Sequence, residues 1–186
     1  MNDYSAYETH RETPTFQFAL REDIKEFKTF LPTQAEPKAT GYDVRAAINE
    51  SLLSIKPFDF VKIPLGFRAL CPEGWWFELK PRSSSFAKKY LHCLYGTIDE
   101  CYEGELVLAC QYIPPVSSYI ENYPLSWNDY LIQNTLHINF GDAVGQIIPV
   151  RRQEMKVVEL SNTEIDVEFI NRNSVRGTGG FGSSDK

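Results

Sequence analysis

The feature that most limits the fold of this chain is a long run of short segments rich in β-branched and aromatic residues. Proline, glycine and aspartate separate these segments, which is typical of β-strands joined by turns. Many short strands of this kind indicate an all-β sandwich or barrel. The one clear helix candidate is brief, from Ser84 to Leu91, and serines at its start can cap it. The segments that we predict as strands are 52–57, 60–64, 66–71, 75–80, 104–112, 135–140, 144–149 and 156–160.

Composition limits the classes to which the chain can belong. Its 186 residues, 42% of them hydrophobic, are enough for one sizeable core. A net charge of -6 argues against a surface that binds nucleic-acid backbones. No run is long and apolar enough to span a membrane, and the polar N-terminus lacks a secretory apolar core, so we predict a cytoplasmic protein with neither nucleic acid nor membrane as partner. The four cysteines and three histidines show no zinc-ligand spacing.

Four parts are predicted along the chain. Residues 1–14 are polar and aperiodic, and we expect a disordered extension. Residues 15–170 form the β domain, and residues 171–186 form a flexible arm. Within the domain, 113–134 is too long for a hairpin connection and is rich in aromatics. It is either a loop packed on its own side chains or a surface for an unidentified protein partner.

The C-terminal arm carries the chemistry of a nucleotide site. It places four glycines around Phe181, with Arg176 before them and Ser183 and Ser184 after them. An arginine fork suits phosphate oxygens, glycine amides can approach an anion closely, and a phenylalanine ring offers a face on which a base can stack. Glycine-rich chain is costly to order alone, so its order would come from the nucleotide that it binds.

Four further segments, together with the arm, complete a pattern. They are Ala39-Thr40-Gly41-Tyr42-Asp43-Val44-Arg45, Pro81-Arg82-Ser83-Ser84-Ser85, Gly96-Thr97-Ile98-Asp99-Glu100-Cys101-Tyr102-Glu103-Gly104-Glu105 and Gly141-Asp142-Ala143-Val144-Gly145-Gln146-Ile147. In this order, and with the arm as the fifth, they resemble the five motifs of the trimeric dUTPase family.

The resemblance implies a fold and an activity. The fold would be the dUTPase-like β-clip or jelly-roll barrel of short strands, with one short helix and the flexible arm closing over the active site. The activity would be hydrolysis of dUTP to dUMP and pyrophosphate. Mg²⁺ would be the cofactor, held by the substrate phosphates and water rather than directly by protein ligands. The protein would be a homotrimer whose sites are shared between subunits.

The resemblance also implies a role for each site residue. Asp99 would activate the attacking water, and Tyr102 would lie against the deoxyribose so that a 2'-hydroxyl clashes. Asp43 would organise the site. The other residues with a catalytic role would be Arg82, Ser83, Gln146 and Arg176. The remaining substrate contacts would come from Ser84, from the base-reading hairpin with Cys93, Leu94, Gly96, Thr97 and Ile98, and from Gly180, Phe181, Gly182 and Ser183 of the arm.

Two positions depart from the family pattern, and two rival functions remain. Cys101 stands where the family has a second acidic residue, and Ser85 stands where it has an aliphatic one, which is expected to weaken local packing. A dCTP deaminase would need a glutamate where this chain has Ala109. A regulatory or protein-binding module that uses 113–134 is the other alternative. We interpret Asp142 as a turn residue, and Lys88 and Lys89 as solvated charges.

Overall fold

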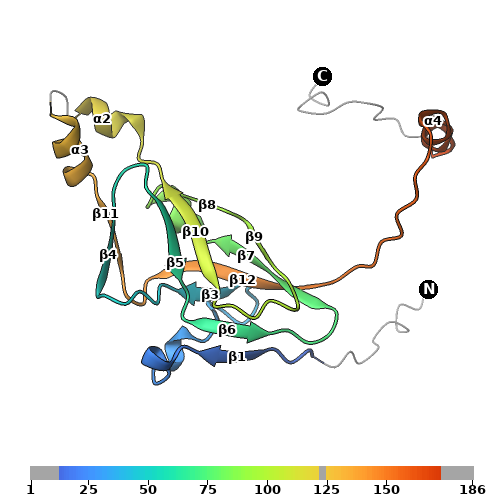
Figure 1. Ribbon diagram of the computed structural model, residues 1–186, viewed down its shortest axis with the longest axis horizontal. Helices are drawn as coiled ribbons and strands as arrows, with labels where there is room; N and C mark the ends of the chain where they lie inside the picture. The colour runs from blue at the N-terminus through green and yellow to red at the C-terminus, as the bar shows by residue number, and fades with distance from the viewer. Residues whose placement is uncertain (1–12, 122–124, 173–186) are drawn as a thin grey trace, which may run out of the picture. The chain divides into compact units, whose positions relative to one another are not determined.

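The structure of the protein, a computed structural model, describes residues 13–121 and 125–172. Its contacts divide the chain into two compact units, one that ends at Arg152 and one that begins at Gln153. The described strands all belong to the first unit, with short helices between some of them (Figure 1). The predicted all-β class is therefore confirmed for this unit.

The described strands of the first unit form four antiparallel sheets. The largest has the order β2-β3-β12-β7-β9, and a second has the order β5-β10-β8. Two further sheets are the pairs β1-β6 and β11-β4. These sheets do not close into one continuous barrel. The strands are β1 Gln17–Leu20, β2 Thr33–Gln34, β3 Tyr42–Arg45, β4 Leu52–Ile55, β5 Phe60–Pro64, β6 Phe67–Leu70, β7 Trp75–Pro81, β8 Leu91–Cys93, β9 Gly96–Ile98, β10 Val107–Tyr112, β11 Leu136–Asn139 and β12 Ala143–Arg151.

The core is built from the inward faces of these sheets. Phe77 and Leu79 are both buried, as expected because alternate residues of a strand point to the same face. They belong to one buried cluster with residues of their own sheet, Val44 and Ile147, and with residues of the other three sheets, Ile55, Ile63, Phe67, Leu108 and Ile138. Burial of apolar surface contributes about 25 cal/mol per Å². A slip of the strand register by one residue would turn these side chains to the opposite face and lose this contribution, so the register is strongly favoured.

The helices of the first unit are short. Two 3-10 turns, Glu22–Ile24 and Lys28–Phe30, occupy part of the segment before the first motif. Ile24 and Phe30 pack around Ala47 in a small second cluster. The helix α1, Ser83–Ala87, is shorter than the predicted 84–91, because the chain re-enters a sheet at β8.

The long connection at 113–134 contains two helices instead of the predicted loop. These are α2, Val116–Glu121, and α3, Trp127–Gln133 (Figure 1). The Ser126 hydroxyl caps α3 by accepting a hydrogen bond from the amide of Asp129. Tyr130 is buried, stacks on Trp127 with ring centroids 5.4 Å apart, and shares a 3.1 Å hydrogen bond with Ser118. The segment thus packs in part on its own side chains, and Trp127 also stacks on Phe58 outside the segment.

The second unit corrects two further expectations. Residues 156–160 do not form the predicted strand, since a strand requires a hydrogen-bonding neighbour and the described residues of the second unit contain no other strand. The helix α4, Asn162–Asn171, follows instead, so the chain has more than the one short helix expected. Its start was readable in the sequence, because Ser161 and Glu164 form a capping box.

No helix among the described residues is both long enough and apolar enough to pass through a membrane.

Candidate active site

The first part of the candidate site lies where β7 leads into α1. The strand β12 runs between β3 and β7, so Gln146 is level with Asp43 on one side and with Lys80 on the other. Arg82 directly follows β7, and its Nε lies 3.5 Å from Oδ1 of Asp43. The Asp43 side chain is 16% exposed and that of Arg82 is 37% exposed, so the guanidinium is held on one side and open to solvent on the other.

The pairing of β3 with β12 brings the first and fourth motifs together, and a glycine permits their close contact. A Cβ atom at Gly41 would lie only 2.1 Å from Oε1 of Gln146, a distance that no side chain tolerates. Any other residue at this position would therefore displace the glutamine. The absence of a side chain at Gly41 lets the Gln146 amide lie across the chain that leads into β3.

The three serines of the second motif differ in how deeply they are buried. Ser83 is exposed and Ser84 is half-buried, whereas Ser85 is buried. The Ser85 hydroxyl donates a 2.6 Å hydrogen bond to the carbonyl oxygen of Val144, which also accepts from the amide of Arg82 at 3.3 Å. Ser85 was expected to weaken local packing, but it ties the start of α1 to β12, because its polar atom is satisfied.

The second part of the candidate site is the turn that follows β9. Asp99 is exposed, and its carbonyl oxygen accepts a 3.0 Å hydrogen bond from the amide of Tyr102. The Tyr102 ring lies over Gly104, since a Cβ atom there would be 2.4 Å from the phenol oxygen. The Tyr102 residue remains 43% exposed, so part of it is accessible to a ligand.

The segment predicted to read the base is not a simple hairpin. β8 pairs with β10 and β9 pairs with β7, so the strands on either side of Leu94 belong to different sheets. The Leu94 amide is already bound to the carbonyl of Ala109 at 2.9 Å, whereas its side chain is exposed. β9, which contains Gly96, Thr97 and Ile98, is the edge strand of the largest sheet, and an edge strand leaves backbone donors and acceptors unpaired.

Cys93 has a defined partner across the strands. It lies opposite Cys110 on β10, and both thiols are free. The Cys110 thiol, which hydrogen-bonds the Cys93 sulfur, lowers the pKa of Cys93, while this bond and burial raise the pKa of Cys110. The Cys93 side chain is therefore engaged with its neighbour, and its thiol also donates a 3.7 Å hydrogen bond to the carbonyl oxygen of Leu91.

The structure does not bring the two parts of the site together within one chain. In the pairing of β7 with β9, Ile98 is level with Phe77, which makes Asp99 level with Trp76. Arg82 lies six residues further along an extended backbone. At 3.2–3.4 Å per residue, this corresponds to about 20 Å. One substrate α-phosphate cannot contact both parts of a single chain.

Comparisons with known proteins identify the relatives of this chain. No protein-family model matches it. It is 47% identical over 78 residues to the deoxyuridine 5'-triphosphate nucleotidohydrolase of Aquifex aeolicus, a match over 41% of this chain and 51% of that protein. It is 30% identical over 157 residues to the enzyme of the same name from Maricaulis maris, across 83% of this chain and 86% of that protein. The chain belongs to the dUTPase family.

A solved structure agrees with this assignment at the level of the fold. A mutant dUTPase of Staphylococcus bacteriophage 80alpha, solved with dUpNHpp, superposes with a TM-score of 0.66. The match covers 92% of this chain and 99% of that chain, at 24% sequence identity. The Maricaulis maris relative confirms the family predicted from the five motifs.

Some family motif residues lie outside the part that the structure describes. These are Arg176, Gly180, Phe181, Gly182 and Ser183 of the arm. Within residues 13–121 and 125–172, no three histidine, cysteine or acidic side chains gather in a way that would hold a metal ion.

Two motif residues, Asp142 and Glu105, make contacts that the sequence did not predict. Lys89 is not a solvated charge, because its Nζ lies 2.8 Å from Oδ2 of Asp142. Asp142 does occupy a turn, and its carboxylate also accepts from the amide of Asn139. Burial alone would raise the pKa of Asp142, but Lys89 and the Asn139 amide outweigh it and lower that pKa. A lysine 53 positions away in sequence carries no local signal of this pairing.

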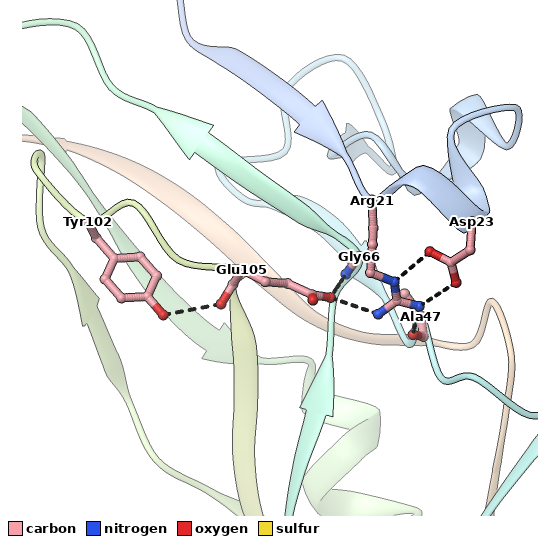
Figure 2. Close-up of polar contacts among 6 residues, drawn as sticks. All are labelled: Arg21, Asp23, Ala47, Gly66, Tyr102 and Glu105. Carbon is pink, nitrogen blue, oxygen red and sulfur yellow. Dashed lines mark hydrogen bonds and ion pairs between the residues drawn. The ribbon is translucent and has the colours of Figure 1, made fainter.

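Glu105 of the third motif also makes contacts that the sequence did not predict. Its carboxylate binds the amide of Gly66 and the guanidinium of Arg21, which comes from before the first motif (Figure 2). The third motif contains Glu105, but nothing in the sequence pairs it with a residue 84 positions earlier.

Proposed function

We propose that the protein is a dUTP diphosphatase, which hydrolyses dUTP to dUMP and pyrophosphate. The observation that carries the proposal is the third motif: an exposed Asp99 directly follows the edge strand β9, and the exposed Tyr102 lies three residues later. A carboxylate, an aromatic ring and unpaired backbone groups are thereby gathered in one segment. Membership of the dUTPase family supports the same activity.

The base and sugar would be recognised by this segment. The open edge of β9, at Gly96, Thr97 and Ile98, offers backbone groups to the uracil edge. Cytosine would be refused, because its amine is a donor where uracil has an acceptor, and an unpaired buried polar group is costly. Tyr102 would pack against the deoxyribose and leave no room for a 2'-hydroxyl.

The chemical step would use Asp99 as general base. The carboxylate takes a proton from a water whose oxygen forms a bond to the α-phosphorus, and the bond from that phosphorus to the bridging oxygen breaks. Pyrophosphate leaves with the bonding electrons. Arg82, Ser83 and Gln146 would bind the phosphate oxygens, with Ser84 beside them, and Asp43 orients Arg82 through the 3.5 Å contact.

Mg²⁺ would be the cofactor. The guanidinium, hydroxyl and amide groups of Arg82, Ser83 and Gln146 suit phosphate oxygens rather than a metal, so these residues would hold the triphosphate that carries the ion together with water. The ion would neutralise charge on the leaving pyrophosphate. In the arm, Arg176, Gly180, Gly182 and Ser183 would add phosphate donors, and Phe181 would stack on the base.

The active sites would lie between subunits of a homotrimer. The separation of about 20 Å between Asp99 and Arg82 along β7 supports this proposal, because a neighbouring copy can bring its Arg82 to the Asp99 of the first. Each site would then contain the third motif of one chain and the phosphate-binding motifs of another.

A protein-binding role at 113–134 is a second proposal. Ile120 on α2 and Ile132 on α3 are 66% and 59% exposed, which favours a partner with an apolar surface. This role does not compete with hydrolysis, because none of the motif residues lies in the segment.

One assay tests the main proposal. Release of pyrophosphate is measured with Mg²⁺ and dUTP, beside dCTP, dTTP and UTP. We expect turnover of dUTP alone at comparable concentrations. Deamination of dCTP, or no turnover of dUTP, would refute the proposal; the half-buried Ala109, which has no carboxylate, argues against deamination.

A further inference from the structure

The phenol of Tyr102 is held by the chain itself. Its hydroxyl donates a 3.2 Å hydrogen bond to the backbone carbonyl oxygen of Glu105 (Figure 2). Together with the close approach to Gly104, this bond fixes where the ring stands. The position of the ring therefore depends on the position of the Glu105 backbone.

The Glu105 side chain anchors that backbone to another sheet. Its Oε1 accepts a 2.8 Å hydrogen bond from the amide of Gly66 and a 3.0 Å ion-paired hydrogen bond from Nη1 of Arg21. Gly66 lies between β5 and β6 with φ of +78°, a left-handed conformation that favours glycine. The next residue, Leu106, is bound through its amide to the carbonyl of Phe67.

Arg21 is itself fixed from several directions. Its Nη2 donates to the buried Ala47 carbonyl at 2.8 Å, and the guanidinium binds both carboxylate oxygens of Asp23 at 2.7 and 3.0 Å (Figure 2). The Arg21 side chain is 25% exposed and that of Glu105 is 30% exposed, whereas Asp23 is 52% exposed. The Arg21–Glu105 pair is therefore less exposed than the Arg21–Asp23 pair, and it is the pair connected to Tyr102.

We propose that Glu105 and Arg21 are positioning residues that set the selectivity of the protein for deoxyribose through the placement of Tyr102. The inference rests on the proposed function, since it assigns sugar selection to Tyr102. Neither residue needs to touch the substrate. Arg21 fixes Glu105, Glu105 fixes the carbonyl to which the phenol is bound, and the ring then stands where a 2'-hydroxyl would clash.

The test is the ratio of kcat/KM for dUTP to that for UTP in substituted proteins. Tyr102→Ala serves as the reference, because it gives the ratio of a protein that lacks the ring. Glu105→Ala and Arg21→Met remove the anchor, and we expect each to lower the ratio about tenfold, because small misplacements have effects of this size. Glu105→Gln should retain most of the ratio, since its amide oxygen can still accept from Gly66 and Arg21. Arg21→Lys should lie between Arg21→Met and wild type.

The matched control is Asp23→Asn, which alters the exposed partner of Arg21 but leaves the Arg21–Glu105 pair. Its ratio should stay within about twofold of wild type. A purely structural role would reduce the active fraction, and so lower kcat/KM for both nucleotides equally, without changing the ratio. An unchanged ratio in Glu105→Ala and Arg21→Met, with thermal unfolding confirming that either is folded, overturns the inference.

A binding measurement separates this inference from the proposed function. Calorimetric titration with dUMP and UMP reports sugar selection without turnover. A wild-type protein that prefers dUMP but does not hydrolyse dUTP overturns the proposed function. In that case the ratio of the dUMP affinity to the UMP affinity decides the inference: a lower ratio in Glu105→Ala supports it, and an unchanged ratio overturns it. A wild-type protein without preference between dUMP and UMP overturns the inference.

Discussion

At the scale of single residues, the sharpest prediction concerns Asp99. Asparagine has nearly the same shape as aspartate but cannot take a proton from water, so Asp99→Asn should bind dUTP and lose most of its turnover. General bases typically contribute about 10²–10⁴-fold. Single-turnover kinetics beside equilibrium binding of dUTP would measure the two effects separately. A loss of less than about tenfold would mean that another group acts as the base.

The Lys89–Asp142 pair gives a residue-scale prediction with a defined pH dependence. The pKa of Asp142 is lowered in the folded state from its ordinary value of 3.8. The pair therefore stabilises the fold above this value, and the contribution is lost as pH falls through the lower, folded pKa. Lys89→Met should cost up to about 1 kcal/mol of unfolding free energy at neutral pH, since both groups are partly exposed.

Denaturant unfolding at several pH values would measure this effect. The difference between Lys89→Met and wild type should shrink as the pH is lowered below 3.8. Lys88→Met is the control, because it removes the same charge from an exposed neighbour. An equal effect of the two substitutions at every pH would contradict the assignment of the stabilisation to Asp142.

The sequence indicated candidate catalytic and binding residues more readily than the contacts that position them. Asp99, Tyr102 and Arg82 stand in short motifs whose residue types and spacing are informative by themselves. The contacts of Glu105 with Arg21 and of Lys89 with Asp142 join distant segments, and strand register decides them. The hydroxyl bond of Ser85 was missed for the same reason, since its acceptor is Val144 on β12.

At the scale of elements, the insertion at 113–134 can be separated from hydrolysis. α2 and α3 lie beside each other through Ser118 and Tyr130, and Trp127 stacks on Phe58 with ring centroids 6.0 Å apart. Replacing the segment by a tight turn should therefore lower thermal stability, because Phe58 loses a stacking partner. The dUTP turnover should remain within about threefold of wild type, since the motifs lie elsewhere.

Thermal unfolding, gel filtration and the pyrophosphate assay would test this shortened chain. Trp127→Ala is a milder companion variant that removes the stacking partner but leaves both helices in the sequence. A shortened protein that folds and assembles as wild type does but is inactive would place the insertion within the active site.

Strands that are delimited by turn residues could be predicted from the sequence. Strand pairing could not, because it depends on segments that are distant in sequence. The predicted segments 60–64 and 75–80 coincide closely with β5 and β7, because turn residues delimit them. The strands β8 and β9 are only three residues long, and their pairing with different sheets has no sequence signature. Residues 156–160 have a strand composition, yet composition alone cannot supply the neighbouring strand that a sheet needs.

At the scale of the whole molecule, the separation of Asp99 from Arg82 leads to a prediction about mixed assemblies. A chain that ends before Arg176 should fold but be nearly inactive, because it lacks the arm that would bind phosphates and exclude water. An Asp99→Asn chain should be inactive because it lacks the base. Refolding the two inactive chains together should restore activity, since a site can then combine Asp99 of the truncated chain with the arm of the Asp99→Asn chain.

The activity restored in the mixture shows whether the base and the arm of one active site come from the same subunit or from different subunits. If the base and the arm of a site come from different subunits, random mixing creates some sites with both parts intact, and activity should rise and fall with the mixing ratio. Each variant refolded alone is the control, and mass spectrometry of the intact assembly would establish that mixed trimers form. A third mixture supplies the contrast: chains that carry both changes, refolded with the truncated chain, have no arm at all and should stay inactive. Mixed trimers of the two single variants without activity would place Asp99 and the arm of each site in one subunit, and the shared-site proposal would then be wrong.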